Sequence, residues 1–353
     1  MRHKIAVVFG GCSSEHWVSL QSATVVRNLD PEKYHPIMMG ITRQGEWLHY
    51  AGPVEQIAED SWYTHESCSP ALLSLSRTSK GFYLFSGNQP LRLAVDLVFP
   101  VLHGKNGEDG TLQGLLDMAG IPYTGCGTLS STLGMDKDLA HTLAKAAGIK
   151  VLCSEVVRKT DELKSVIKRA EPLGWPVMVK PARPGSSLGI TLANSRNELE
   201  EALESAFQHD CKVVIEEYVE GFEVGCAILG NRQLTIGDID EVELNHSWFD
   251  YQEKYTQTNS KIHVPARITQ EVAAQIRNTA VNLYRTLGCK GFARVDMFLT
   301  PQGELVFNEL NTIPGLTAKS RFPRMLAGIG MSFSQVLDQI IVLALEHAND
   351  SPN

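Results

Sequence analysis

Residues 293–311 read ARVDMFLTPQGELVFNELN, two largely apolar runs on either side of a short segment that contains proline and glycine. This pattern predicts a β-hairpin. A two-residue loop at Gln302 and Gly303 would set Pro301 opposite Glu304. That register would fix the partner of every residue farther from the turn.

The polar residues of the predicted hairpin gather on one face. Counting outward from the turn places Asp296 opposite Glu309 and Arg294 opposite Asn311. Residues two apart, or directly opposite each other, share a face of the sheet. The other face is apolar apart from Asn308, and it suits a core with Val295, Met297, Leu299, Val306 and Leu310.

This polar face has two interpretations. Two carboxylates and an amide offer oxygen ligands, the type that Mg²⁺ prefers, and Arg294 beside them could hold an anion. A salt-bridged face in solvent is the commoner reason for charges on a strand. A four-residue loop would also shift the pairing, so spacing alone leaves both interpretations open.

Composition narrows the class of protein. The chain has 353 residues, of which 43% are hydrophobic and 20% charged, typical of two or three globular domains. A formal net charge of −8 argues against general binding to nucleic acid or anionic membranes. The seven cysteines are odd in number and lack C-x-x-C spacing, which indicates reduced thiols rather than disulfides or a zinc site. Without a signal peptide or an apolar run near the roughly 18 residues of a membrane span, we expect a cytoplasmic protein.

The first third of the chain alternates strands, glycine-rich loops and helices. Residues 4–11, KIAVVFGG, predict a strand that ends in two glycines, and residues 94–104, AVDLVFPVLHG, a second strand before the helical residues 111–120. Such alternation predicts a parallel α/β layer with ligands at the carboxyl ends of its strands. No G-x-G-x-x-G motif follows the first strand, so hydride transfer loses its main support.

Isolated candidates for ligand binding occur elsewhere. Lys180 ends a predicted strand before the loop GSSLG, whose N–H groups and hydroxyls could approach phosphate oxygens, although it is not a P-loop. Glu216 and Glu223 flank a linker suited to adenine and ribose. His103 and Glu15 lie in or after glycine- and serine-rich loops. Taken singly, each is better explained as an ordinary turn or an exposed charge.

Read together, eight segments resemble the D-alanine–D-alanine ligases of the ATP-grasp superfamily. They occur in family order and span nearly the whole chain: FGGCSSEHWVSLQSA, LHGKNGEDGTLQG, GIPYTGCGTLSSTLGMDK, VMVKPARPGSSLG, VVIEEYVEGFEVGCAILG, FDYQEKY, GFARVDMF and FNELNTIPGLTAKSRFP. The resemblance implies an α/β fold of three domains. An N-terminal parallel α/β layer (1–124) would precede two α+β domains that hold ATP between them, a central one (125–219) and a C-terminal one (220–353) with a lid loop at about 245–262.

The resemblance also implies a reaction and its residues. ATP would phosphorylate the carboxylate of D-alanine, and the amine of a second D-amino acid would displace the phosphate. Two Mg²⁺ ions, or Mn²⁺, would be bound by Asp296, Glu309 and Asn311. ATP would contact Lys137, Lys180, Ser187, Glu216, Glu217, Tyr218, Val219, Glu223, Lys254 and Phe298. The implied catalytic residues are Glu15, Ser186, Arg294, Gly315 and Ser320.

The second substrate is the finer question. The residues implied in substrate binding are His103, Asp240, Phe249, Tyr255 and Arg321. Ligases that use D-lactate lack the FDYQEKY lid motif of this chain, which sets D-lactate aside. The combination of Asp240, Phe249 and Arg321 resembles the D-alanine–D-serine subgroup of vancomycin-resistance ligases, so D-serine is favoured over D-alanine.

Two other functions remain open at this point: a different ATP-grasp carboxylate–amine ligase, and a nucleotide-binding regulator without turnover. The implied partners are small D-amino acids and a second copy of the chain in a homodimer, with no nucleic acid or membrane. The implied role is the synthesis of peptidoglycan precursors.

Overall fold

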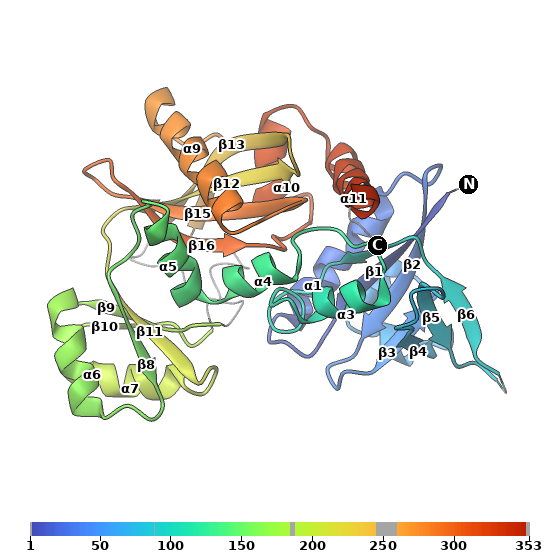
Figure 1. The fold of residues 1–353 in the computed structure, drawn as a ribbon, viewed down its shortest axis with the longest axis horizontal. Helices are drawn as coiled ribbons and strands as arrows, with labels where there is room; N and C mark the ends of the chain where they lie inside the picture. The colour runs from blue at the N-terminus through green and yellow to red at the C-terminus, as the bar shows by residue number, and fades with distance from the viewer. Residues whose placement is uncertain (1, 88, 184–187, 245–259, 351–353) are drawn as a thin grey trace.

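The computed structural model describes residues 2–87, 89–183, 188–244 and 260–350. They form three β-sheets with helices packed against them, which confirms the predicted α/β class (Figure 1). In Figure 1 the seven-stranded sheet lies at one end of the molecule, and the other two sheets lie toward the opposite end.

The first sheet has seven strands in the order β6-β5-β4-β3-β2-β1-β7. Strand β1 pairs in parallel with β2 and β7, as the alternation of strands and helices predicts. The pairs from β2 to β6 are antiparallel, so this layer is mixed and the expectation of a purely parallel layer was wrong. Its elements are β1 (His3–Gly10), α1 (His16–Ser22), η1 (Ala23–Asn28), β2 (Tyr34–Ile41), β3 (Trp47–Tyr50), α2 (Val54–Ala58), η2 (Trp62–Thr64), β4 (Ser69–Leu73), β5 (Gly81–Leu84), β6 (Leu91–Ala94), β7 (Leu97–Pro100) and α3 (Thr111–Ala119).

The second sheet has four antiparallel strands in the order β10-β9-β11-β8. Helices α6 and α7 bury apolar side chains against it in a core of its own. Helices α4 and α5 precede it in the chain but contact β16 of the third sheet. The elements of this part are α4 (Thr128–Met135), α5 (Lys137–Ala146), β8 (Ser154–Arg158), α6 (Leu163–Ala170), η3 (Glu171–Leu173), β9 (Val177–Pro181), β10 (Thr191–Ala193), α7 (Arg196–Ala206) and β11 (Lys212–Glu217).

The third sheet has five antiparallel strands in the order β14-β13-β12-β15-β16. Residues of α5 and α9 form one core with it. Its elements are β12 (Phe222–Gly230), β13 (Leu234–Leu244), β14 (Ser260–His263), α9 (Gln270–Thr286), β15 (Phe292–Leu299), β16 (Leu305–Asn311), α10 (Arg321–Gly328) and α11 (Phe333–Asp350).

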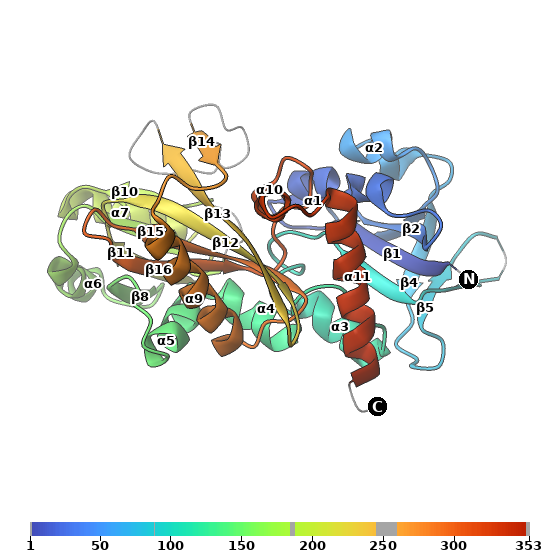
Figure 2. The ribbon, with the colours of Figure 1, turned by 90° about the horizontal axis from the view of Figure 1, so that it is seen from above.

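The first and third sheets share a hydrophobic core. Phe9 of β1, Leu229 of β12, Phe322 of α10 and Ile340 of α11 all belong to the same buried cluster. Figure 2 shows α11 lying between the two sheets. Within the described residues, no single helix is long and apolar enough to cross a membrane; α10 and α11 together meet that criterion but are bent by 103°.

Glycine at position 40 is required by packing. A Cβ added to Gly40 would lie 2.2 Å from the ring of Trp62, which is fully buried. We expect Gly40→Ala to lower the free energy of unfolding by about 1–3 kcal/mol, because the indole must move. Urea denaturation measures this change. In Gly114→Ala of α3, the new Cβ would meet nothing closer than 3.8 Å, and a gain of about 0.5–1 kcal/mol is expected.

The β15–β16 hairpin has the predicted pairing at its functional end. Asp296 pairs with Glu309 and Arg294 pairs with Asn311, as the count from the turn predicted. The turn itself differs from the prediction. Thr300 donates its N–H to the carbonyl of Glu304 at 3.0 Å, so residues 301–303 form a three-residue loop.

A β-bulge at Asn308 restores the predicted register. Near the turn Met297 faces Phe307, but the next pair along is Asp296 and Glu309, so Asn308 is an extra residue on β16. A bulge adds one residue to a strand, so the side chains before and after it no longer follow one strict alternation between the two faces. Phe307 therefore packs in the core with Leu310. Val306 pairs with Phe298 and lies on the other face of the hairpin from the one predicted, but it is buried as predicted.

Candidate functional site

Seven predicted functional residues line one cavity of about 650 Å³. The cavity lies where the loops that follow β1 and β7 face the end of the β15–β16 hairpin and the start of α10. The carboxyl ends of two parallel strands thus border the site, as the α/β pattern predicted. The seven residues are Glu15, His103, Arg294, Asn311, Gly315, Ser320 and Arg321.

The loops after β1 and β7 place His103 and Glu15 at the cavity. His103 Nε2 and the hydroxyl of Ser22 lie 2.9 Å apart, and both residues are buried. The carboxylate of Glu108 accepts the N–H of Gly104 at 2.7 Å. A Cβ at Gly104 would lie 2.7 Å from Glu15 Oε2, so glycine lets Glu15 approach this loop. Sequence reasoning missed Ser22 and Glu108; the charge of Glu108 within a glycine-rich loop was the available signal for it.

Ser320 lies beside the backbone of Gly315 at the opposite wall of the cavity. Its hydroxyl accepts the N–H of Thr317 at 3.1 Å and shares a hydrogen bond with the Thr317 hydroxyl at 2.8 Å. A Cβ at Gly315 would lie 3.0 Å from the Ser320 hydroxyl. The loop before α10 thus holds a hydroxyl and a glycine backbone close together, as the predicted roles of Ser320 and Gly315 need.

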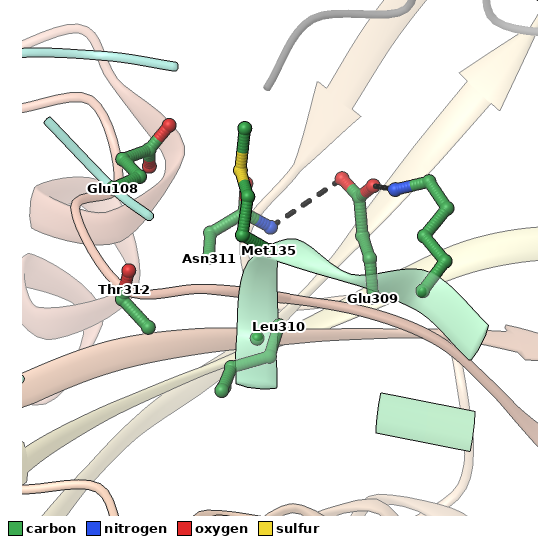
Figure 3. A pocket seen from close by; sticks show the side chains of 8 residues that line it. Glu108, Met135, Glu309, Leu310, Asn311 and Thr312 are labelled. Carbon is green, nitrogen blue, oxygen red and sulfur yellow. Dashed lines mark hydrogen bonds and ion pairs between the residues drawn. The ribbon is translucent and has the colours of Figure 1, made fainter. Parts of the chain in front are cut away.

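The acidic residues of the hairpin are held by cationic and amide groups. Arg294 donates Nε at 2.8 Å and Nη2 at 2.6 Å to the two oxygens of Asp296. Asn311 Nδ2 lies 2.9 Å from Asp296 and 3.5 Å from Glu309. Lys137 Nζ donates to Glu309 at 2.8 Å. Figure 3 shows the amide of Asn311 directed at the Glu309 carboxylate.

Charge balance keeps these groups ionised despite burial. Burial raises the pKa of Asp296, but Arg294 and Arg321 outweigh it and the net shift is downward. Burial lowers the pKa of Lys137, but the charge of Glu309 outweighs it and the net shift is upward. The carboxylate of Asp296 is therefore charged at neutral pH, as a ligand of a metal ion must be.

The donor set fits Mg²⁺. The carboxylates of Asp296 and Glu309 both lie within 3.5 Å of the Asn311 amide, so three side chains converge on one place. A half-turn of that amide would present its oxygen instead of its nitrogen. Mg²⁺ is typically bound by one or two carboxylates and completes its shell with water and phosphate oxygens. In the described part of the chain, no three His, Cys, Asp or Glu side chains form a metal cluster.

Five of the predicted nucleotide residues lie on, or directly after, β9 and β11, the two inner strands of the four-stranded sheet. Lys180 of β9 and Glu216 of β11 form a buried ion pair with 2.5 Å between Nζ and Oε2. Burial raises the pKa of Glu216, but the charge of Lys180 opposes it and the net shift is downward. Glu217 accepts the N–H of Cys153 at 2.8 Å. The other two predicted adenine contacts follow directly, half-buried, in Tyr218 and Val219.

Arg321 joins three carboxylates at the start of α10. It donates Nε and Nη2 to the two oxygens of Asp240 at 2.7 and 2.8 Å, and Nη1 to Glu223 at 2.5 Å. Its Nη2 also lies 3.5 Å from Asp296. Burial raises the pKa of Glu223 although Arg321 opposes the shift. Phe298, the remaining predicted ATP contact on β15, pairs with Glu223 across the sheet.

Some predicted site residues lie outside the described residues. They are Ser186, Ser187, Phe249, Lys254 and Tyr255. Of the predicted lid at about 245–262, the structure describes residues 260–262, and Ile262 lines the cavity.

Comparisons with known proteins point in one direction. Residues 4–126 match the family model described as D-ala D-ala ligase N-terminus, and residues 143–342 match the model described as D-ala D-ala ligase C-terminus. The chain is 43% identical to the vancomycin B-type resistance protein VanB of Enterococcus faecalis, with 97% of this chain and 98% of that protein covered. It is 44% identical to a putative D-alanine–D-lactate ligase of Streptomyces coelicolor, with 98% of each covered.

A solved structure is also similar along the whole chain. The crystal structure of the VanG D-Ala:D-Ser ligase from Enterococcus faecalis matches with a TM-score of 0.90 and 51% sequence identity. That match covers 98% of this chain and 100% of the other.

Proposed function

The chain belongs to the D-alanine–D-alanine ligase family, of ATP-grasp fold, and from that membership we propose that it joins D-alanine to a second D-amino acid at the expense of ATP. The observation that carries the proposal is the single cavity that collects Glu15, Arg294 and Ser320 beside the carboxylates of the hairpin. A regulator without turnover would not need this complete set.

The proposed reaction has two steps. A carboxylate oxygen of the first D-alanine attacks the γ-phosphorus of ATP, and ADP leaves. The amine of the second substrate then attacks the acyl carbon of D-alanyl phosphate, and phosphate leaves as the peptide bond forms. Both steps concentrate negative charge, so positioning and charge neutralisation supply most of the catalysis.

The residues of this chain divide these tasks. Glu15 holds the ammonium of the first D-alanine, and Lys137 and Lys180 hold phosphates of ATP. Arg294 and the N–H of Gly315 face the oxyanion of the tetrahedral intermediate. Mg²⁺ bound at Asp296, Glu309 and Asn311 would offset the charge of the phosphates.

We propose D-serine as the preferred second substrate. The buried Arg321 and Asp240 form a polar network at the cavity, and a serine hydroxyl could exchange hydrogen bonds with it. A pocket built for a hydroxyl discriminates against an analogue that leaves its polar groups unpaired. The 51% identity to the VanG D-Ala:D-Ser ligase supports this choice, whereas other relatives are described as D-alanine or D-lactate ligases.

A competition assay tests both the ligase reaction and the choice of D-serine as the second substrate. D-alanine, ATP and Mg²⁺ are offered with equimolar D-alanine and D-serine as acceptors, and dipeptides are resolved by mass spectrometry. We expect mainly D-alanyl-D-serine. D-alanyl-D-alanine as the main product would refute the acceptor and keep the ligase, and no dipeptide with any D-amino acid would refute the ligase.

The role of Arg321 is tested by Arg321→Lys, which keeps the positive charge but loses the bidentate hydrogen bonds to Asp240. We expect the ratio of D-serine to D-alanine products to fall by about tenfold or more. Arg267→Lys is the matched control, because Arg267 makes the same kind of contact with Glu241 and does not line the cavity. An unchanged ratio in Arg321→Lys would make Arg321 purely structural.

The wider organisation belongs to the same proposal. We place the domain boundaries at 1–124, 125–219 and 220–353, because each of these ranges holds one sheet. We further propose a cytoplasmic homodimer that supplies peptidoglycan precursors. Sedimentation at micromolar concentration tests the dimer.

A further inference from the structure

Helix α5 contacts the bulged strand at two points. Lys137 and His141 are four residues apart, so they leave the helix on the same face. Lys137 binds the carboxylate of Glu309, and His141 Nε2 lies 2.7 Å from the backbone carbonyl of Asn308. The second contact reaches the backbone of the bulge itself, the one residue of β16 without a partner opposite it in the register of β15.

His141 is buried and firmly held. It is 4% exposed, and its ring packs edge-on against Phe307 with 5.4 Å between ring centres. A carbonyl only accepts hydrogen bonds, so Nε2 carries the proton and donates. Burial lowers the pKa of His141, which is therefore neutral at physiological pH with an unprotonated Nδ1. Among the described residues, Nδ1 has no hydrogen-bond partner.

The bulge decides where Glu309 points. Without the extra residue, strict alternation would continue the register of Phe307, and Glu309 would share the core face of that side chain. With it, Glu309 faces Asp296 and Asn311 faces Arg294. A bulge interrupts the ladder and leaves a backbone group to be satisfied elsewhere. His141 supplies that bond from a different part of the chain.

We propose that His141 is a positioning residue, which fixes the bulge at Asn308 so that Glu309 and Asn311 meet Asp296 as one metal site. The inference rests on the proposed function, because it assigns a purpose to the metal ligands of the ligase. It adds a residue that contacts neither substrate nor metal. It also gives α5 two tasks, one on the carboxylate of Glu309 and one on the backbone beside it.

Two substitutions separate hydrogen bonding from packing. His141→Leu keeps a similar apolar volume and removes the donor. His141→Gln can place an amide N–H where Nε2 lies and should restore the bond. Ala144→Gly is the matched control, since Ala144 is buried on the same helix, and glycine there destabilises the helix without removing the bond to Asn308.

The first readouts do not depend on catalysis. Hydrogen exchange in the ligand-free protein reports on residues 305–311, and electron paramagnetic resonance measures Mn²⁺ binding in the presence of ADP. We expect His141→Leu to speed amide exchange in β16 by about tenfold, the effect of one lost hydrogen bond. We expect the affinity for Mn²⁺ to fall by about tenfold or more, as for other residues that orient a metal ligand. His141→Gln should lie near the wild type in both.

Steady-state kinetics then give a split that general destabilisation would not produce. The KM for ATP with Mg²⁺ should rise in His141→Leu, while the KM for D-alanine stays within about twofold. Wild-type Mn²⁺ affinity and amide exchange in His141→Leu would overturn the inference, as would an equal loss of Mn²⁺ affinity in Ala144→Gly. A wild-type protein that binds Mn²⁺ with ADP but makes no dipeptide would refute the proposed function alone, and the exchange and affinity data would still decide the role of His141.

Discussion

Glu309→Gln is expected to lower kcat by about 10³-fold or more while the protein stays folded. The substitution keeps the size of the side chain but removes the charge that faces Lys137 and, in the proposed site, Mg²⁺. A metal ion supplies several kcal/mol of charge stabilisation to phosphoryl transfer, and 4 kcal/mol corresponds to about 10³ in rate. The measurement is steady-state turnover at saturating ATP, Mg²⁺ and D-amino acids.

Glu304→Gln is the matched control for this prediction. Glu304 lies at the turn end of the same hairpin and also pairs with a lysine, Lys150, but on the exposed surface. An exposed ion pair contributes about 0–1 kcal/mol to stability. The turnover of Glu304→Gln should therefore stay within about twofold of the wild type. A near-normal rate in Glu309→Gln would remove Glu309 from the metal site.

Arg294→Lys is expected to lower kcat by about 10²–10³-fold, the usual effect of removing one donor to a developing oxyanion. Lysine keeps the positive charge beside the buried Asp296, so the carboxylate is not left unpaired. It cannot reproduce the two parallel bonds of the guanidinium. Single-turnover kinetics with ATP and D-alanine separate the two steps, and the loss should fall on dipeptide formation rather than on release of ADP.

A second arginine–aspartate pair serves as the comparison. Arg183 also binds Asp210 through two nitrogens, but it does not line the cavity. Arg183→Lys should therefore keep wild-type turnover. If Arg294→Lys also turned over normally, the oxyanion would have to be stabilised by other groups.

The hairpin shows both the reach and the limit of sequence reasoning. Alternation and turn residues predicted that Asp296 and Glu309 would meet, and they do. Two departures of the hairpin from the prediction cancel: the loop has three residues instead of two, and the bulge at Asn308 compensates for the extra residue. The sequence held one sign of the bulge, because Asn308 is a polar residue at a position that was expected to lie in the core. Turn length and bulge position depend on packing partners that spacing does not reveal.

The spacing of residues along the sequence could not predict contacts between segments that lie far apart in the chain. Lys137 and His141 meet β16 across about half of the chain, and nothing in the periodicity of α5 singles out those partners. The family resemblance assigned Arg321 and Asp240 to the second substrate and Glu223 to ATP. That Arg321 also binds Glu223 follows only from the fold, which brings β12, β13 and α10 together.

The separate core of the four-stranded sheet has a mechanical consequence. The buried apolar residues of the four-stranded sheet, α6 and α7 form a cluster separate from the core that the first and third sheets share. A rotation of this sheet with its two helices would therefore expose little apolar surface. The first and third sheets, which share one hydrophobic core, should instead unfold together in one cooperative transition. Lys212 on β11 binds Asp136, which precedes α5, so a buried ion pair joins this unit to the helix that packs against the third sheet. We infer that the four-stranded sheet moves together with α6 and α7 as one body when the proposed nucleotide site opens and closes.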